Sequence, residues 1–212
     1  MPLTGAWATA WMTLSAQVVS ARRAELNTLD RDIGDGDHGE NMDRGFEAVA
    51  GKLDTLPAEA SPADVLKLVA TTLISTVGGA SGPLYGTAFL KAAIAVGGLD
   101  RLDPQALVAL LTAARDGIVL RGKAELGDKT MVDAWTPAVI AAAAVQKDGG
   151  DVVALLRAAA EAADRGAVAT EPLVARKGRA SYLGERARGH RDPGAESTRL
   201  LLRAAADAAD VS

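Results

Sequence analysis

Apolar residues recur at helical spacing along most of this sequence, whereas the alternation typical of half-buried strands is nearly absent. Alanine is frequent and aromatic residues make up only 3% of the chain. This mixture favours close-packed helices, because alanine has the highest helix propensity. The sequence therefore predicts an all-α fold. The apolar faces of eight expected helices run from Trp7 to Val18, Met42 to Leu53, Val65 to Leu73, Leu84 to Phe89, Leu107 to Ile118, Val132 to Val139, Leu155 to Leu156 and Leu200 to Ala208.

Start signals support three of these helices. Ser61 and Asp103 each precede a proline, which is the pattern of a capping side chain followed by proline at the first helical position. Asp151 is expected to cap the seventh helix in the same way. The fourth helix is expected to follow Pro83, and the sixth to continue despite Pro137.

Bulk properties exclude several classes of protein. The 212 residues suit one domain, 1–212, and no repeat or linker divides them. A net charge of −4 argues against a general nucleic-acid binder. The lack of cysteine excludes disulfides, thiolate metal sites and a cysteine nucleophile. No apolar run reaches the ~18 residues of a membrane span, and the first run lacks the preceding basic region of a secretory signal. We therefore expect a cytoplasmic protein.

Glycine-rich segments separate the expected helices at 34–39, 78–86, 122–130 and 176–194. The last segment is longer than an ordinary connection, and loops beyond ~12–15 residues are usually functional or disordered. Several glycine-rich loops in a helical protein suggest one site assembled where helix ends meet.

The acidic turn within residues 29–42, LDRDIGDGDHGENM, is the most informative segment. Asp30, Asp35 and Asp37 surround a turn that two glycines make tight. Clustered carboxylates repel one another unless a cation neutralises them, and hard oxygen ligands select magnesium or calcium. We expect Asp37 also to cap the next helix, which leaves His38, Gly39 and Asn41 where a helix N-terminus receives phosphate oxygens.

Other interpretations of this turn fit less well. The string GDGDHG matches G-x-G-x-x-G, but a helix precedes it and its aspartates would repel a pyrophosphate. An EF-hand fails because Gly34 stands where a ligand belongs and Asp35 where the glycine belongs. A solvated acidic turn that only caps a helix is the plain alternative. Three aspartates with two interleaved glycines favour metal over that alternative.

A run of small residues, 77–86, offers unobstructed backbone N–H groups, which bind anions. Gly79, Ala80 and Ser81 are candidates to cradle phosphates. A close helix crossing that needs small residues explains this segment equally well. Residues 117–124 nearly match a Walker A loop, but Ala124 replaces the metal-binding hydroxyl and a helical face runs through the loop. The overlapping segment 121–131, RGKAELGDKTM, is predicted to form one edge of a nucleotide site, with Gly122, Thr130 and Met131 as the candidate contacts.

The region 171–194 carries six basic residues against three acidic ones. Arginine suits polyphosphate because its planar group donates paired hydrogen bonds, but six cations are too many for one nucleotide. Most of them are expected to face solvent or a partner. Asp192, Pro193 and Gly194 read as the start of the last helix.

Four strings together resemble the L subunits of dihydroxyacetone kinases: LNTLDRDIGDGDHGENMDRG, VGGASGPLYGT, RGKAELGDKTM and ARKGRASYLGERARGHRDPGA. They occur in the family's order across nearly the whole chain. The resemblance implies an antiparallel eight-helix barrel with a nucleotide bound in loops at one rim. It also implies that two magnesium ions are held by Asp30, Asp35 and Asp37. The residues implied to line the nucleotide are His38, Asn41, Ala80, Ser81, Gly122, Met131, Arg179 and the turn Asp192, Pro193 and Gly194.

The resemblance further implies partners. The chain has no room for the K domain that binds dihydroxyacetone, so it is expected to act with a separate K subunit. In the phosphotransferase-system type, ADP stays bound and a phosphohistidine of an M subunit recharges it to ATP. No catalytic residue beyond the metal–nucleotide site is expected on this chain, because phosphoryl transfer needs mainly positioning and charge neutralisation. Arg186, Arg188 and Arg191 are candidates to contact the K subunit.

Three alternatives remain open. In the first, the chain belongs to an ATP-dependent kinase for a related ketose or another small substrate, in which ATP exchanges in each cycle. In the second, it is a nucleotide-dependent partner of a transcription regulator. In a third interpretation His38 or His190 carries the phosphoryl group, although a histidine that only donates and accepts hydrogen bonds is more common.

Overall fold

The structure, a computed structural model, describes residues 2–210. Over that range it has eight α-helices and one 3-10 helix, with a single antiparallel bridge between Leu3 and Leu102 in place of any strand. The all-α prediction is therefore confirmed. The elements are α1 (Gly5–Ile33), α2 (His38–Leu53), α3 (Pro62–Thr76), α4 (Ser81–Ala95), α5 (Pro104–Gly122), α6 (Val132–Lys147), α7 (Val152–Ala169), η1 (Arg179–Ala187) and α8 (Pro193–Asp210).

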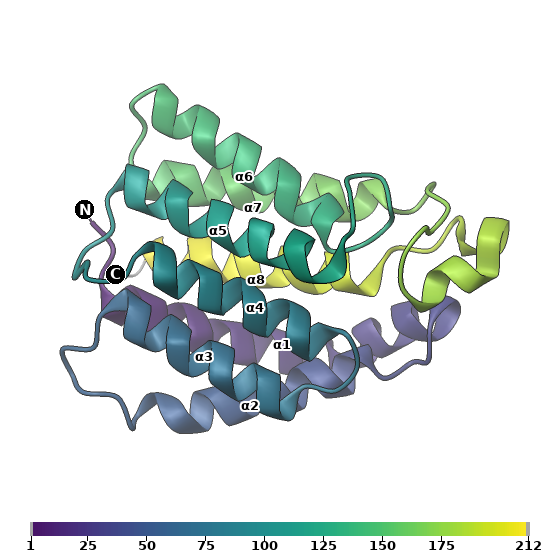
Figure 1. Ribbon diagram of the computed structural model, residues 1–212, viewed down its shortest axis with the longest axis horizontal. Helices are drawn as coiled ribbons and strands as arrows, with labels where there is room; N and C mark the ends of the chain where they lie inside the picture. The colour runs from purple at the N-terminus through teal and green to yellow at the C-terminus, as the bar shows by residue number, and fades with distance from the viewer. Residues whose placement is uncertain (1, 211–212) are drawn as a thin grey trace.

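Each α-helix packs against the next one along the chain, and α8 packs against α1, so the eight helices close into a ring (Figure 1). Consecutive helices run in opposite directions. Every second connection therefore lies at the same end of the ring. The segments 34–37, 77–80, 123–131 and 170–192 share one end, which is the arrangement that a composite site requires.

The helix starts show which local signals decide the fold. Ser61 and Asp64 form the reciprocal capping box of α3, with Asp64 N donating to Ser61 Oγ over 3.2 Å. Asp103 and Asp151 each accept an amide hydrogen three residues later, at 2.8 Å. These three predictions are confirmed. The expected start of α4 after Pro83 is wrong, because the helix already begins at Ser81 and proline is tolerated in a first turn.

The core contains large aromatic side chains from α1 packed among alanines. Trp7 and Trp11 stack with their ring centroids 5.1 Å apart, and each is 1% exposed. Their indole N–H groups donate to the carbonyls of Ala205 and Leu201 in α8, at 3.0 and 2.8 Å. Because a buried indole N–H needs a partner, these two bonds join the first helix to the last.

The long connection before α8 folds back over the end of α1. Its 3-10 helix, yellow-green at the right of Figure 1, projects beyond the ring beside α1. A small second core of Ile33, Ala175, Ala180 and Ala187, with Leu183 against it, attaches this projection to the end of α1.

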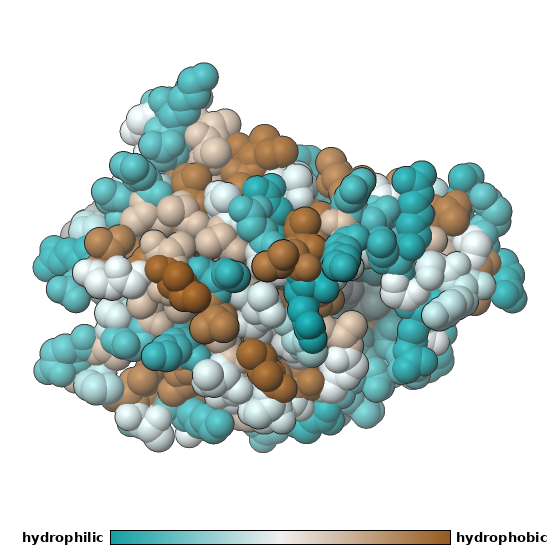
Figure 2. Space-filling view, viewed as in Figure 1, coloured by the Kyte–Doolittle hydropathy of each residue, from teal (hydrophilic) through white to brown (hydrophobic). Residues whose placement is uncertain are grey.

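None of the helices over residues 2–210 is both long and apolar enough to cross a membrane. Figure 2 shows apolar side chains interspersed with hydrophilic ones on one face.

Candidate functional site

Two cavities lie at the end of the ring where the four connections meet. The first has a volume of about 190 Å³ and collects polar side chains from the acidic turn, the glycine run and the segments before α6 and α8. It is lined by Asp30, Ile33, Gly34, Asp35, Asp37, His38, Asn41, Gly78, Gly79, Ala80, Ser81, Leu84, Lys129, Thr130, Met131, Lys177, Gly178, Arg179, Ala180, Asp192, Pro193 and Gly194. The structure thus brings together most of the residues that the sequence singled out.

The acidic turn places one oxygen each from Asp30, Asp35 and Asp37 within 4.8 Å of one another. Asp30, in the last turn of α1, is buried, whereas the other two are exposed. Burial raises the pKa of the Asp30 carboxyl, against the lowering effect of its bonds to the amides of His38 and Asp37. Gly34 is required beside it, because a Cβ there would lie 2.2 Å from Asp30 Oδ1.

The N-terminus of α2 is capped differently from the prediction. The side chain of Asp37 makes no capping hydrogen bond. Instead, Asp30 Oδ2 accepts from Asp37 N at 2.9 Å and from His38 N at 3.1 Å. The carboxylate seven residues earlier therefore satisfies these amides, because the turn at Gly36, with φ of +79°, returns the chain to the end of α1.

This arrangement fits a divalent cation. Three carboxylate oxygens are hard ligands of the kind that magnesium prefers, and Asp35 and Asp37 have no backbone bond that fixes them elsewhere. Arg179 Nη2 lies 3.0 Å from Asp35 Oδ2, and this arginine is 70% exposed at the cavity mouth. The guanidinium of Arg179 is therefore ion-paired with one carboxylate of the cluster.

His38 is held between two hydroxyl groups. Its Nδ1 lies 3.1 Å from Ser81 Oγ and its Nε2 lies 2.9 Å from Ser197 Oγ. Ser197 in turn contacts the buried Tyr85 hydroxyl at 2.7 Å. Burial lowers the pKa of His38 to about 4. A neutral ring with both nitrogens engaged orients Ser81 and is poorly placed to carry a phosphoryl group.

His190 is the other candidate carrier and lies outside both cavities. Its Nδ1 lies 3.3 Å from Asp32 Oδ2 at the surface.

Among the residues near the start of α2, Asn41 lines the first cavity, and its Oδ1 accepts from Arg44. Gly39 lines neither cavity: a Cβ there would lie 2.1 Å from the backbone oxygen of Arg23. Gly39 therefore permits the close crossing of α1 and α2.

The glycine run supplies the N-terminus of α4. Gly79 has φ of +63°, a conformation that favours glycine, and nothing lies within 4 Å of a Cβ built on it. Ala80 and Ser81 follow at the first turn, so their backbone N–H groups face the cavity end of the helix. Gly82 serves packing instead, since its Cβ would lie 2.3 Å from Val77 O. The close-packing interpretation therefore holds for Gly82, and the phosphate cradle at Gly79, Ala80 and Ser81 stays a prediction.

The second cavity, of about 360 Å³, is mainly apolar and shares lining residues with the first. Gly122 and Met131, two of the residues predicted to contact the nucleotide, line this cavity. Thr130 and Met131 line both cavities. The complete lining is Ala80, Pro83, Leu84, Ile118, Arg121, Gly122, Ala124, Thr130, Met131, Val132, Lys177 and Gly178. A polar chamber beside an apolar slot suits a ligand with phosphates at one end and a flat ring at the other.

The turn Asp192–Gly194 closes the first cavity on the side of α8. Asp192 caps that helix, with its Oδ2 accepting from Ala195 N at 2.7 Å. Burial raises the pKa of Asp192 to about 7, against the lowering effect of its bond to the Ala195 amide; the charge of Asp133 raises this pKa further and that of Lys129 lowers it. A Cβ on Gly194 would lie 3.5 Å from Met131. The turn and Met131 therefore lie close together in the lining of the first cavity.

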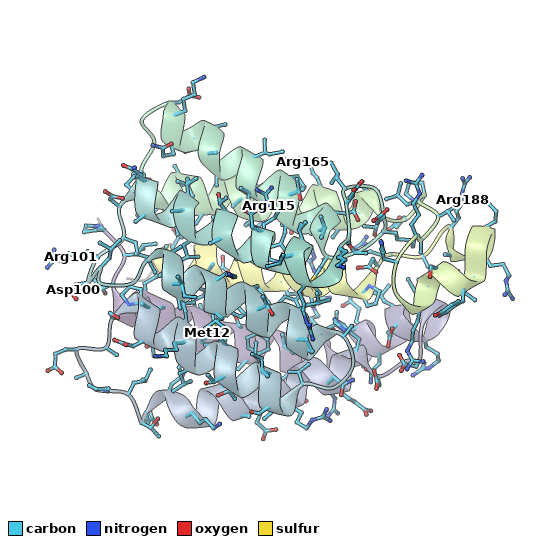
Figure 3. The ribbon with its side chains drawn as sticks, viewed as in Figure 1. Met12, Asp100, Arg101, Arg115, Arg165 and Arg188 are labelled. Atoms are coloured by element: carbon cyan, nitrogen blue, oxygen red, sulfur yellow. The ribbon has the colours of Figure 1, made fainter. Side chains whose placement is uncertain are left out.

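The basic residues of the long connection divide into two groups. Arg188 is exposed on the projection, at the opposite end of the molecule from Asp100 and Arg101 (Figure 3). Arg191 is instead tied down by Glu171 at 2.8 Å and Glu196 at 3.0 Å. Arg188 also pairs, with Glu185 at 2.9 Å, but it is 57% exposed, whereas Arg191 is 26% exposed and held by two carboxylates. A contact of Arg186, Arg188 or Arg191 with a partner stays a prediction.

Several cavity residues escaped the sequence analysis: Gly78, Leu84, Lys129, Lys177, Gly178, Ala180 and, behind His38, Tyr85 and Ser197. Lys129 is the most unexpected, because it is 1% exposed and adopts φ of +63°. Lys129 directly precedes the candidate nucleotide residues Thr130 and Met131, and this position could have indicated that it belongs to the site. The partners of Tyr85 come from 112 residues away along the chain, and no local pattern indicates such a contact.

Comparison with known proteins identifies the family of the chain. The DAK2 domain family matches residues 32–207. The chain is 44% identical over 199 residues to the ADP-binding subunit DhaL of the PEP-dependent dihydroxyacetone kinase of Escherichia coli (strain K12), covering 94% of each chain. It is 40% identical to the corresponding subunit of the PTS-dependent enzyme of Lactococcus lactis subsp. lactis (strain IL1403), covering 91% of each.

Longer relatives contain this unit as a part. The chain is 38% identical to an L-erythrulose 1-kinase of Mycolicibacterium smegmatis, covering 89% of this chain and 33% of that one. The crystal structure of the dihydroxyacetone kinase of C. freundii in complex with AMP-PNP and Mg²⁺ superposes with a TM-score of 0.71 at 27% identity, covering 98% of this chain and 34% of that one. The chain therefore belongs to the DAK2-domain family, among the kinases and kinase subunits that transfer a phosphoryl group to an alcohol.

Proposed function

We propose that residues 1–212 form a single nucleotide-binding domain that holds ADP or ATP through two magnesium ions and transfers the γ-phosphoryl group to dihydroxyacetone bound on a separate K subunit. One observation carries the proposal: the three-carboxylate cluster, the N-terminus of α4 and an apolar slot adjoin one another at a single rim. Relatives named as ADP-binding subunits, similar over nearly their full length, support the nucleotide.

The side chains divide the work of binding. Magnesium supplies neutralisation of the phosphate charge when it is bound by Asp30, Asp35 and Asp37. The backbone N–H groups at the start of α4 are placed to donate to phosphate oxygens, and His38 fixes the Ser81 hydroxyl beside them. Met131 and its apolar neighbours offer a face for the adenine.

The acceptor must come from a partner. Transfer requires an acceptor oxygen held in line with the phosphorus, because proximity and orientation provide much of the rate. The polar groups in the first cavity are accounted for by metal, phosphate and their own hydrogen bonds. We therefore infer that the K subunit docks on this rim, near Arg186 and Arg188 on the projection, and that both proteins act in the cytoplasm.

The proposed donor is a phosphohistidine of an M subunit, which converts retained ADP to ATP on this chain. The naming of relatives as PEP- and PTS-dependent favours this cycle. The second candidate is exchange of free ATP in each cycle, with L-erythrulose or another ketose as acceptor. The name of the M. smegmatis relative, an L-erythrulose 1-kinase, supports a ketose acceptor. The two differ in whether nucleotide leaves the protein.

Two measurements test the proposal. Purified chain is mixed with Mg-ATP and dihydroxyacetone, with and without a cognate K subunit, and formation of dihydroxyacetone phosphate is followed. Turnover is expected only with the K subunit, and robust turnover without it would refute the subunit assignment. Nucleotide is also extracted from the purified chain after denaturation. Stoichiometric ADP supports the retained cofactor, whereas an empty chain that exchanges ATP rapidly supports the second candidate.

A further inference from the structure

Lys129 lines the first cavity, but its ammonium group is bound elsewhere. Nζ donates to Thr170 O at 2.7 Å and to His190 O at 2.5 Å, and a longer contact of 3.4 Å reaches Glu171 O. An ammonium has three hydrogens to donate. All three are therefore directed to backbone carbonyls, and none is left for a phosphate oxygen.

The backbone around Lys129 is held as firmly as its side chain. A φ of +63° is unusual for a residue other than glycine and persists only where the surroundings impose it. Asp133 imposes it from the first turn of α6, since its Oδ1 accepts from Gly127 N at 2.6 Å and its Oδ2 accepts from Thr130 N at 2.8 Å. Both sides of the lysine are thus fixed to α6.

The three carbonyls belong to other parts of the rim. Thr170 and Glu171 follow the last turn of α7, where carbonyls without a partner inside the helix carry partial negative charge and favour a cation. His190 lies two residues before Asp192, the cap of α8. A second bond strengthens the same junction, because Asp192 N donates to Thr170 Oγ1 at 3.0 Å. The lysine therefore joins the segment before α6 to the segment before α8 across the end of α7.

We propose that Lys129 is a positioning residue that sets the separation between two walls of the nucleotide site, Met131 on one side and the turn Asp192–Gly194 on the other. These walls face the same cavity and lie close together, since a Cβ added to Gly194 would come within 3.5 Å of Met131. The lysine acts on nucleotide affinity through this spacing and makes no contact with phosphate. The effect on nucleotide affinity rests on the proposed function, whereas the role of Lys129 in spacing the two walls does not.

Affinity for a series of nucleotides separates positioning from phosphate contact. AMP, ADP and AMP-PNP are titrated by calorimetry at fixed Mg²⁺ into wild type, Lys129→Met, Lys129→Arg and Lys123→Met. Lys123 is a matched control, because it lies in the same segment with φ of 51° but is exposed. Lys129→Met is expected to weaken all three nucleotides by the same factor, about tenfold or more. Lys129→Arg should recover most of the affinity, and Lys123→Met should match wild type.

A loss that grows from AMP to ADP to AMP-PNP would overturn the proposal, because it would indicate a direct phosphate contact. Equal affinity of Lys129→Met and wild type would also overturn it. If Lys129→Met does not fold, Thr170→Val decides, since it removes the neighbouring bond to Asp192 N. That variant should give the same uniform loss, and a loss that depends on phosphate number would count against positioning.

Amide exchange tests the structural part without ligand. Gly189 N donates to Glu171 O at 2.8 Å, and Asp192 N donates to Thr170 Oγ1, so both amides report on the junction. Their exchange is expected to be faster in Lys129→Met than in wild type and Lys123→Met. Unchanged exchange would overturn the positioning role. Failure of wild type to bind any nucleotide would instead overturn the proposed function and leave this result standing.

Discussion

Replacing Asp37 with asparagine is expected to change the stability of the protein in opposite directions without and with magnesium. The side chain of Asp37 makes no capping bond, so the substitution removes a charge without removing a structural hydrogen bond. In metal-free protein the lost charge relieves repulsion from Asp30 and Asp35. With magnesium present, the same substitution removes a ligand.

The size of the metal-free effect follows from the spacing of the carboxylates. Their oxygens lie within 4.8 Å, and two unit charges at that distance in water repel by roughly 0.9 kcal/mol. Asp37 takes part in two such pairs, and physiological salt reduces their sum to about 1 kcal/mol. A stabilisation of that size corresponds to an increase in Tm of about 2–4 °C for a chain of this length.

The assay is thermal unfolding followed by circular dichroism, in EDTA and in millimolar Mg²⁺ with ADP. Asp32→Asn is the matched control, because Asp32 lies in the same turn and carries the same charge but faces His190 outside the cavity. Asp37→Asn should melt above wild type in EDTA and below it with Mg-ADP. A lower Tm in EDTA would mean that Asp37 supports the fold. An equal response to Mg-ADP would remove Asp37 from the metal site.

Three further predictions use other parts of the site. Arg179→Ala should slow transfer with the K subunit by one to two decades, through loss of about 1.5–3 kcal/mol, whereas Arg188→Ala should not, and equal losses would indicate general positive charge. Burial raises the pKa of Asp192 to about 7, so between pH 4 and pH 7 this carboxyl ionises mainly in the unfolded chain. The free energy of unfolding of metal-free wild type should therefore fall by up to about 4 kcal/mol relative to Asp192→Asn as the pH rises from 4 to 7. Urea unfolding at both pH values checks this, and a constant difference would contradict it. Gly39→Ala should lower the free energy of unfolding by about 1–3 kcal/mol through its 2.1 Å clash, whereas Gly51→Ala, with open space around it, should raise it by roughly 0.5–1 kcal/mol.

The sequence predicts the helices well because their signals are local. Ser61, Asp103 and Asp151 cap the helices that directly follow them, so spacing alone identifies them. The start of α4 was predicted late, because Ala80 stands at its cap position and lacks a capping side chain. The alternation of helix direction then determines which loops share an end, and this is why motifs far apart in the chain meet.

The finer contacts of the site depend on tertiary structure. Two aspartates precede α2 within one turn, and sequence spacing favours Asp37 as the cap, whereas the folded chain uses Asp30. The partners of Lys129 lie 41 and 61 residues away, so its burial has no local signal. Likewise, the pairing of Arg191 with Glu196 takes it out of the group of free cations that composition alone suggests.

The seam between α1 and α8 has a consequence for biosynthesis. The indole of Trp7 bonds to a carbonyl 198 residues later, and that of Trp11 to one 190 residues later. While α8 is still in the ribosome, these indole N–H groups and the apolar face of α1 have no partner from that helix. Closing such a long loop is slow compared with local helix formation. The face of α1 that packs on α8 is therefore covered only after nearly the whole chain has been made, and substitutions in α8 should lower the yield of folded protein more than its Tm.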